Sequence, residues 1–512
     1  MTCNIFAETL KIVSTCKETE NGATAFSTTG NACVDLFAEI GALRNGGDYH
    51  SRLFAMIERA YAENPLLLAK ILFYARDVRG GLGEREVFRT AIYYCAHAHP
   101  EIVKNNLLVI PEFGRWDDLF SLIGTPLEKD MWELIRWRFE EDERILKGEI
   151  KGSKVSLLAK WMPSADTSSK DTRALAYLCA SNLDMTVYEY KRRVRALRKH
   201  LNLLETKMSS KKWGEIDYPS VPSQAHLRHI QAFLRNDNTR YTEFIEDVNA
   251  GKKEIKTATL YPYEIVERLQ FLSNWHISSD GSFVRDYVAR DEVNKPLETM
   301  WKNLPNYVKD ANILIMADTS GSMMGRPMSI SSSLAIYFAE RNKGTFGGLY
   351  MTFDSNPRLI SIDSNKPLCD RYAQLLEGPW GGSTNLYGAF NLLLDVAVKS
   401  KAKAEDMPKS LVVITDMEIN SGGDDHQKWN TIVDDMREKY AQAGYELPNI
   451  IFWNVASRHE TYLARCDYKG VQLVSGSSPS VFEAVIGFTN GMTPIECVEK
   501  VLGAERYSGI SV

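Results

Sequence analysis

The sequence has little of what marks a secreted or membrane protein. Its eight cysteines are scattered and form no CxxC pair, so we expect reduced thiols rather than a disulfide framework or a zinc ribbon. No apolar run approaches the length of a bilayer span, and the first residues lack the basic and apolar regions of a signal peptide. We therefore expect a cytoplasmic protein that is not associated with a membrane.

Common enzyme motifs are missing as well. No Walker A string occurs, and Gly80-Gly-Leu-Gly83 follows no strand pattern, which excludes a dinucleotide fingerprint. Asp318-Thr-Ser lacks the second Asp that haloacid-type phosphatases need, and none of the nine histidines lies beside a plausible Ser or Cys nucleophile. We expect a protein that is not an enzyme. Metal-dependent phosphoryl transfer is a weaker alternative, because no general base can be named.

Neither charge nor composition is extreme. The net charge is -5, and 44% of the residues are hydrophobic and 25% charged, as in ordinary soluble globular proteins. A chain of 512 residues is long enough for two or three domains. Affinity for a nucleic acid must therefore come from a local basic patch.

Polar side chains follow an apolar run of strand length near residue 313. Ile313 to Ala317 reads as a buried strand, and it is followed by Asp318, Ser320 and Ser322. Ligands of α/β sheets gather at the carboxyl ends of the strands, so these oxygens are expected around one point. Oxygen ligands with few charges suit a hard divalent cation, above all Mg²⁺.

Two later places in the sequence offer further oxygen ligands. A second apolar run, Leu411 to Thr415, stops at Asp416, and a glycine loop presents Thr384 just before the helical pattern of residues 386–398. This βαβ alternation places polar groups repeatedly at strand ends. An α/β Rossmann-like sheet with a divalent-cation site is the expectation, and a metal-free sheet with polar loops is the alternative.

These residues resemble the metal-ion-dependent adhesion site of the von Willebrand factor A domain, over about residues 306–512. The resemblance implies that Asp318, Ser320, Ser322, Thr384 and Asp416 hold Mg²⁺, with Mn²⁺ or Ca²⁺ as alternatives. It also implies that an acidic group of a protein partner completes the metal shell. One departure follows Asp416, where many such domains have glycine and this chain has Met417 and Glu418. The role of Glu418 is open.

The region before residue 300 shows almost no strand pattern. Helical patterns cover residues 48–62, 64–76, 85–97 and 128–146, with short breaks between them. Successive amphipathic helices favour a HEAT-like α-helical solenoid, and whether it closes into a ring is open. We expect a helical domain over residues 1–305 and the α/β domain over residues 306–512.

A basic segment lies within the helical half. Apolar residues alternate by three and four from Val187 to Met208, which predicts one helix packed on a neighbour. The candidate RNA-binding residues of this segment are Lys191, Arg192, Arg193, Arg195, Arg198, Lys199, Lys211, Lys212 and the stacking candidate Trp213. A solvated helix face is the alternative.

Three strings resemble those of a family of uncharacterised proteins that couple a helical region to a von Willebrand-type domain. They are Phe73 to Glu86, Phe113 to Asp118 and Leu158 to Pro163. The architecture is in turn similar to that of the TROVE-containing Ro autoantigen family, which implies binding of small or structured RNA. Within the strings, Arg76, Arg79, Arg115 and Lys160 are candidate RNA contacts. For each of them a structural ion pair between helices is favoured over an RNA contact.

The leading interpretation is a non-catalytic, RNA-binding ribonucleoprotein component without DNA specificity, which carries a Mg²⁺-dependent docking site. The competing interpretation is a protein-protein adaptor that captures an acidic partner residue through the metal and binds no RNA.

Overall fold

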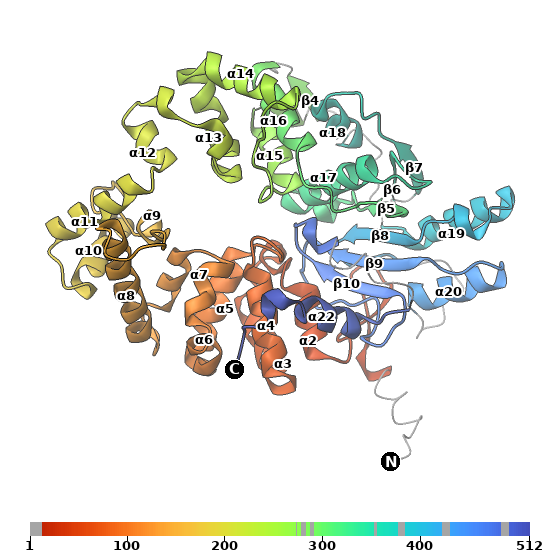
Figure 1. Cartoon of the computed structure of the whole chain (residues 1–512). Coiled ribbons are helices and arrows are strands. Elements are labelled where there is room, and N and C mark those ends of the chain that lie inside the picture. Colours follow the sequence, from red (N-terminus) through yellow and green to blue (C-terminus); the bar gives the residue numbers. More distant parts are fainter. Residues whose placement is uncertain are drawn as a thin grey trace. The chain divides into compact units, whose positions relative to one another are not determined.

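The computed structural model describes residues 13–272, 274–277, 283–286, 291–352, 356–376, 384–421, 431–482 and 491–512. They form two compact units, which we call the sheet unit and the helical unit (Figure 1). The sheet unit comprises Met1–Ile71, Gly80–Leu82 and Thr257–Ser508. The helical unit comprises Leu72–Arg79, Gly83–Lys256 and Gly509–Val512. The sheet unit thus combines Met1–Ile71 with Thr257–Ser508, and the expected domain boundary near residue 305 stays a prediction.

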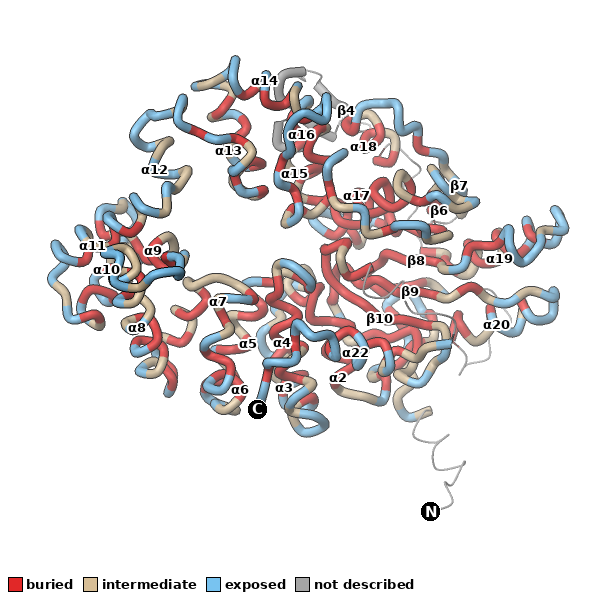
Figure 2. The backbone as a smooth tube through the Cα atoms, in the orientation of Figure 1, coloured by how far each residue is buried: buried red, intermediate tan, exposed pale blue. Residues whose placement is uncertain are grey.

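The sheet unit is built on a six-stranded mixed sheet in the order β10-β9-β8-β5-β6-β7. All neighbours are parallel except β7, which pairs antiparallel with β6. The predicted strands are confirmed as β5 (Ile313–Ala317) and β8 (Ser410–Thr415). The other strands are β6 (Leu349–Thr352), β7 (Arg358–Ser361), β9 (Asn449–Asn454) and β10 (Val471–Ser475). Figure 2 shows the central strands buried along their length, as their continuous apolar sequences require.

Helices surround this sheet. They are α2 (Ala32–Glu39), α3 (His50–Glu63), α15 (Pro262–Leu272), α16 (Asp291–Lys302), α17 (Arg326–Arg341), α18 (Leu368–Leu376), α19 (Leu386–Ser400), α20 (Ile432–Gln442) and α22 (Pro494–Leu502). Short 3-10 helices are η1 (Leu43–Gly46), η6 (Gly321–Met323), η7 (Ala404–Asp406) and η8 (Glu505–Tyr507). The helix α22 begins with a capping box in which Thr493 and Glu496 exchange hydrogen bonds.

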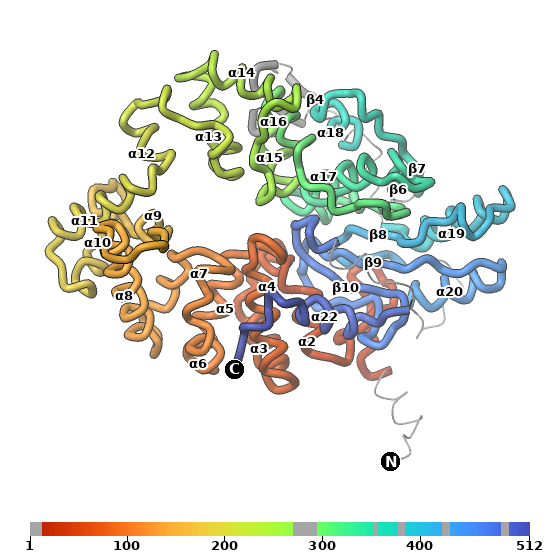
Figure 3. Tube along the Cα trace, in the orientation of Figure 1, coloured from red at the N-terminus to blue at the C-terminus, as the bar shows by residue number. Residues whose placement is uncertain are grey.

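The N-terminal residues belong to the sheet unit because they pack on its last strands. In Figure 3 the red N-terminal trace lies beside the blue C-terminal strands, and α2 packs on β10. A hairpin of β1 (Cys16–Glu18) and β2 (Thr24–Phe26) adds a bridge between Phe26 and Tyr462. Together with the hairpin β3 (Asn274–Ile277) and β4 (Phe283–Asp286), it shows that the expectation of almost no strands before residue 300 was too strict.

The helical unit begins within α4 (Pro65–Arg76). Its longer helices are α5 (Arg85–Ala98), α8 (Glu128–Leu146), α10 (Lys170–Asn182), α11 (Val187–His200), α13 (Ser223–Asn236) and α14 (Asn238–Asn249). Shorter elements are α6 (Pro100–Lys104), η2 (Leu107–Val109), α7 (Ile110–Phe113), η3 (Trp116–Leu122), α9 (Leu158–Trp161), α12 (Leu204–Ser209), η4 (Trp213–Glu215) and η5 (Tyr218–Ser220). Within the described ranges, no helix is both long and apolar enough to cross a membrane.

The predicted helices near residues 48–62, 64–76, 85–97 and 128–146 are confirmed within a few residues by α3, α4, α5 and α8.

The prediction of one helix from Val187 to Met208 was wrong. The helix α11 ends at His200, and Asn202 takes a left-handed φ of 50° before α12 begins. The apolar spacing of the sequence continues across this turn, although α12 itself has no buried residue.

Candidate functional site

The two predicted metal-binding aspartates follow neighbouring strands. In the sheet register Ala317 of β5 lies opposite Ile414 of β8. Asp318 follows Ala317 directly, and Asp416 comes two residues after Ile414. Strand β6, which follows β5 along the chain, pairs with one edge of β5, and β8, which comes later, pairs with its other edge. Such a switch point opens a crevice at the carboxyl ends of the strands, where α/β proteins bind ligands.

Hydrogen bonds fix the first loop around the Asp318 carboxylate. Its Oδ1 accepts a hydrogen bond of 2.8 Å from the Ser320 backbone N–H. Its Oδ2 accepts one of 2.7 Å from the Thr415 hydroxyl, which belongs to the last residue of β8. The hydroxyls of Ser320 and Ser322 lie 2.9 Å apart. Asp318, Ser320 and Ser322 therefore present their oxygens on one short loop, as predicted.

Thr384 is joined to the loop that follows β8. Its backbone N–H donates to Asn420 Oδ1 over 2.9 Å, and the Asn420 N–H donates back to the Thr384 carbonyl over 3.1 Å. Thr384 is buried, with 1% of its surface exposed. The pair of bonds ties Thr384 to the loop that carries Asp416, four residues before Asn420. The glycines that precede Thr384 lie outside the described residues.

Asp416 supplies the observation that best fits a cation. Its Oδ1 accepts a 3.2 Å hydrogen bond from the Glu418 N–H, whereas its buried Oδ2 has no hydrogen-bond partner among the described residues. Burial, and then the neighbouring Asp416 carboxylate, raise the pKa of Asp318 to about 6. Two adjacent buried carboxylates with an unsatisfied oxygen form a site that a positive charge would stabilise.

The donor set also restricts the kind of metal. Among the described residues there is no cluster of three or more His, Cys, Asp or Glu side chains arranged for a metal ion. Two carboxylates and several hydroxyls remain, and such hard oxygen donors suit Mg²⁺ or Mn²⁺ rather than zinc.

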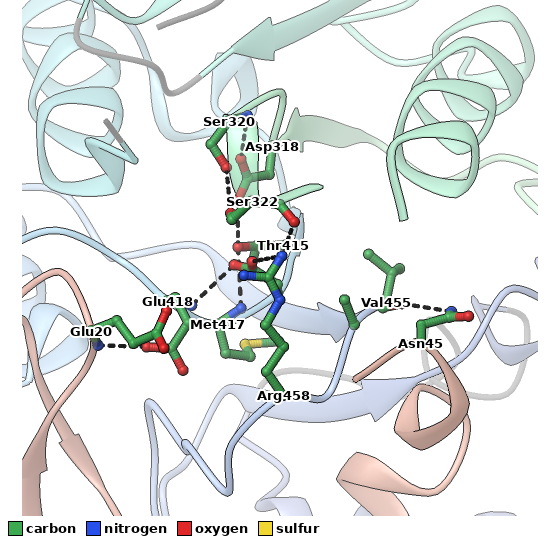
Figure 4. A network of polar contacts seen from close by, with 12 residues as sticks. Glu20, Asn45, Asp318, Ser320, Ser322, Thr415, Met417, Glu418, Val455 and Arg458 are labelled. Atoms are coloured by element: carbon green, nitrogen blue, oxygen red, sulfur yellow. Dashed lines mark hydrogen bonds and ion pairs between the residues drawn. The ribbon is translucent and has the colours of Figure 1, made fainter. Parts of the chain in front are cut away.

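Arg458, which was not predicted, lies beside these carboxylates (Figure 4). Its Nη2 lies 3.7 Å from Asp416 Oδ2 and donates a hydrogen bond to the Ser322 carbonyl. The residue comes four positions after β9, the strand next to β8 in the sheet. Its position in the loop after a third parallel strand is the signal that sequence reasoning passed over.

Glu418, whose role was open, directs its carboxylate toward the N-terminal hairpin and Thr461. Its Oε2 accepts a 2.6 Å hydrogen bond from the Glu20 N–H, and its Oε1 accepts one of 3.1 Å from the Thr461 hydroxyl. Asn21 donates to its backbone carbonyl over 2.7 Å. Glu418 therefore anchors the N-terminal hairpin to the Asp416 loop (Figure 4).

Several predicted RNA contacts in the helical unit are engaged within the protein. Arg76 is 2% exposed, and its Nε lies 2.7 Å from Asp118 Oδ2, so it forms a structural ion pair, which was the favoured alternative to an RNA contact. Arg115 pairs with Asp117 at 2.8 Å and stacks 4.0 Å from the Trp161 ring centroid. Lys160 lies 3.8 Å from Glu205. Arg79 is exposed and donates to the Glu112 carbonyl over 2.8 Å.

Gly114, which lies in the string Phe113 to Asp118, packs against the buried ion pair of Arg76 and Asp118. A Cβ atom on Gly114 would lie 2.3 Å from Asp118 Oδ2 and 2.6 Å from Arg76 Nε. Only glycine leaves room for the pair, so this string is explained by packing rather than by contact with RNA.

The cations around α11 fall into two groups. The partnered group comprises Lys191, 2.5 Å from Asp166, Lys212, 2.9 Å from Glu215, and Arg193, whose Nε lies 2.6 Å from Glu143 Oε1. Arg198 also belongs to it, because its guanidinium donates to the carbonyls of Ala159 and Met162 and to the Ser164 hydroxyl. Lys191, Arg193 and Arg198 thus connect α11 to its neighbours, whereas the pair of Lys212 and Glu215 lies outside this helix.

The second group forms one face of α11. Arg192, Arg195 and Lys199 are exposed, and no carboxylate of the described residues forms an ion pair with them. Their spacing of three and four places them in a row, and Tyr188, 75% exposed, precedes them in the same row. We call Tyr188, Arg192, Arg195 and Lys199 the α11 stripe. Tyr188 was missed from the sequence, although its spacing from Arg192 indicates the shared face.

A pocket of about 670 Å³ borders the stripe. Arg195 and Lys199 line it, and further positive charge comes from Lys191, Arg198, Lys207 and Lys212. Only Asp166 and Glu215 contribute carboxylates to its lining. Lys211 is exposed outside this lining, and Trp213 is half-buried in η4, where its carbonyl accepts a hydrogen bond from Arg240.

Comparisons with known proteins place the chain among uncharacterised relatives. A family model described as a domain of unknown function (DUF2828) matches residues 19–135 and 134–314, and a second such model (DUF7788) matches residues 312–502. The two models meet at the start of β5. The uncharacterized protein L728 of Acanthamoeba polyphaga mimivirus is 26% identical over 505 residues, which are 91% of this chain and 84% of that protein.

Among solved structures, the Ro (RSR) protein of Deinococcus radiodurans matches with a TM-score of 0.38 and 14% identity, over 88% of this chain and 92% of that one. The predicted membership in an uncharacterised family is thus confirmed by the family models. The assignment to the von Willebrand type stays a prediction.

Proposed function

The chain belongs to the family described as a domain of unknown function (DUF2828), and we propose that it is a non-catalytic RNA-binding protein with a divalent-cation docking site. The helical unit would bind RNA through the α11 stripe. The sheet unit would hold the cation between its Asp318 and Asp416 loops.

The RNA proposal rests on three neighbouring cations that form no ion pair with a carboxylate of the described residues. Elsewhere on α11, Lys191 and Arg193 pair with Asp166 and Glu143, and Arg198 donates hydrogen bonds to backbone carbonyls. From Arg192 to Lys199 the stripe rises roughly 10 Å along the helix, enough for consecutive phosphates of a single strand. Tyr188 adds an exposed ring on which a base can stack. Cations and an aromatic side chain on one face are the combination that binds single-stranded RNA.

A filter-binding titration of the full chain with single-stranded and hairpin RNA tests this proposal. We expect the triple variant Arg192→Glu, Arg195→Glu, Lys199→Glu to lose most of the affinity. Because three phosphate contacts are removed, the slope of log K against log salt should fall by about 2. The matched control reverses Lys129, Lys147 and Lys151, which are exposed cations of the same unit.

Wild-type binding no tighter than non-specific at low salt would overturn RNA binding. An equal loss in the control would show that net charge rather than the stripe is responsible.

The unsatisfied Asp416 Oδ2 carries the proposal for the cation. Asp318, Ser320, Ser322, Thr384 and Asp416 would hold Mg²⁺, and the ion when bound would attract an acidic group of a partner protein. The chain's own residues fix the loops through the Asp318–Thr415 and Thr384–Asn420 hydrogen bonds. If the cation binds and RNA does not, the adaptor alternative is the one that stands.

Calorimetry with Mg²⁺ and Mn²⁺ tests the cation site. Asp318→Ala should abolish binding, because it removes one of the two carboxylates of the proposed site. Asp395→Ala, an exposed aspartate of α19, is the control and should bind as the wild type does. Metal affinity retained in Asp318→Ala would exclude this site.

A further inference from the structure

We propose that Arg458 is a built-in cation that competes with the divalent ion for the Asp416 carboxylate. This inference rests on the proposed cation site. It adds a residue that sets how tightly the site binds its ion.

The guanidinium occupies the position where a positive charge is needed. Arg458 Nη2 lies 3.7 Å from Asp416 Oδ2, the buried carboxylate oxygen without a hydrogen-bond partner in the described structure. The same nitrogen donates to the carbonyl of Ser322, whose hydroxyl is a candidate metal ligand. Figure 4 shows the side chain reaching toward the two loops from its own strand end. Arg458 thus connects the loop of Ser322 with the loop of Asp416, while Asp416 Oδ2 still accepts no hydrogen bond from the described residues.

The backbone around Arg458 is held by the N-terminal helices. Arg52 of α3 donates to the carbonyls of Ser457 and Arg458, and Ser457 donates its hydroxyl to Glu39 of α2. The next residues are tied by the ion pair of Arg59 with Glu460 at 2.6 Å. The loop is therefore fixed, and the long Arg458 side chain, 31% exposed, is the part that can swing toward solvent.

Charge balance makes the two cations alternatives. Asp318 and Asp416 are buried side by side, so their ionised forms need a counter-charge. Arg458 is the cation that forms an ion pair with either of them among the described residues. A divalent ion at Asp416 Oδ2 would repel a guanidinium 3.7 Å from that oxygen, and Arg458 must move away for the ion to bind.

Calorimetry with MnCl₂ on the full chain tests this competition. We expect Arg458→Gln to bind Mn²⁺ about tenfold more tightly than the wild type, a difference of ~1.4 kcal/mol. Arg458→Lys keeps the charge and should stay within about twofold of the wild type, which is well below that difference. Arg59→Gln removes an ion pair from the same loop without facing the carboxylates, and it should leave Mn²⁺ affinity unchanged.

A thermal-shift measurement checks the same idea independently of affinity. Without metal, Arg458→Gln should unfold at a lower temperature than the wild type, because two carboxylates lose their counter-charge. Added Mn²⁺ should then raise its melting temperature by more than that of the wild type.

The outcomes separate the two proposals. Mn²⁺ binding of equal or lower affinity in Arg458→Gln overturns the role of Arg458 and leaves the cation site in place. Tighter binding by Arg458→Lys as well would overturn the role assigned to its charge. No Mn²⁺ binding in any variant, the wild type included, overturns the cation site itself.

Discussion

Two groups of basic side chains in the helical unit carry the same positive charge but have different surroundings. Arg76, Arg89 and Arg115 converge on Asp117 and Asp118, with Arg76 and Arg89 each 2.7 Å from an Asp118 oxygen. On α11, by contrast, Arg192, Arg195 and Lys199 are exposed and lie outside any ion pair of the described residues. The presence of a carboxylate, rather than the abundance of cations, separates a structural cluster from a candidate binding surface.

The structural cluster depends on one carboxylate. Asp118 is fully buried and accepts hydrogen bonds from Arg76 Nε, from Arg89 Nε and, over 2.9 Å, from the Arg115 N–H. Burial keeps this carboxylate from water, so its stability depends on these donors. The α11 stripe remains hydrated, and losing one of its members leaves nothing buried without a partner.

The largest expected effect comes from breaking the structural cluster. Asp118→Ala leaves the buried Arg76 without its counter-charge and should lower the free energy of unfolding by roughly 3–5 kcal/mol. Urea unfolding followed by circular dichroism measures the change. As a control, Asp166→Ala removes an exposed partner of Lys191 and should cost less than about 1 kcal/mol. Similar effects of the two substitutions would contradict the contrast between buried and exposed pairs.

The buried side chain of His226 differs from the arginine cluster, because no carboxylate of the described residues pairs with its charged form. Burial lowers the pKa of His226 to about 3, below its ordinary value of 6.5. Between these values the unfolded chain binds more protons than the folded one, so stability falls as the pH falls below 6.5. From pH 7 to pH 5 the loss from this group should be about 2 kcal/mol.

Urea unfolding at both pH values checks the His226 prediction. His226→Phe should remove this part of the pH dependence, whereas His200→Gln, at an exposed position, should retain it. An unchanged pH dependence in His226→Phe would show that other groups cause it.

Tyr188 sharpens the comparison on the side of the binding surface. Tyr188→Ala should weaken binding of single-stranded RNA about tenfold, or ~1.4 kcal/mol, because one stacked base is lost. Protein stability should barely change, since the ring is 75% exposed. Tyr177→Ala on α10, at 49% exposure, is the control for removal of a surface aromatic. Equal RNA affinity in the two variants would remove Tyr188 from the stripe.

The smallest expected effect compares two adjacent arginines. Arg193→Ala breaks its pair with Glu143 and should cost about 1 kcal/mol of stability, with little change in RNA binding. Arg192→Ala should leave stability unchanged and weaken RNA binding, most of all at low salt. Unfolding and filter-binding measurements on both variants test whether one loses stability and the other loses RNA affinity. A uniform response would mean that the stripe and the structural arginines do not differ.

Local patterns in the sequence predicted much of the architecture. Helices such as α5 and α8 and strands such as β5 and β8 follow from apolar periodicity and strand-length apolar runs. The capping box of α22 is likewise a local signal. The break at Asn202 was missed because the apolar spacing of three and four continues through a single left-handed residue. The N-terminal hairpin was missed because its strands are three residues long.

Only those parts of the candidate cation site that follow from local sequence patterns were predicted. Asp318 and Asp416 each end an apolar strand, and parallel strands bring such ends to one edge. Arg458 and the N-terminal anchor of Glu418 were not predictable in this way. Their contacts join residues 136 and 398 positions apart, and no periodicity encodes such separations.

By itself, the sequence determined which residue types stand at strand ends and on which face of a helix the cations of α11 lie. Both properties depend only on neighbours within a few residues. The tertiary structure decided which of those charges are neutralised: Arg76 by Asp118, Arg193 by Glu143 and Asp416 in part by Arg458. A charge is neutralised by whatever group the fold brings within a few ångströms, and that group comes from a distant part of the chain.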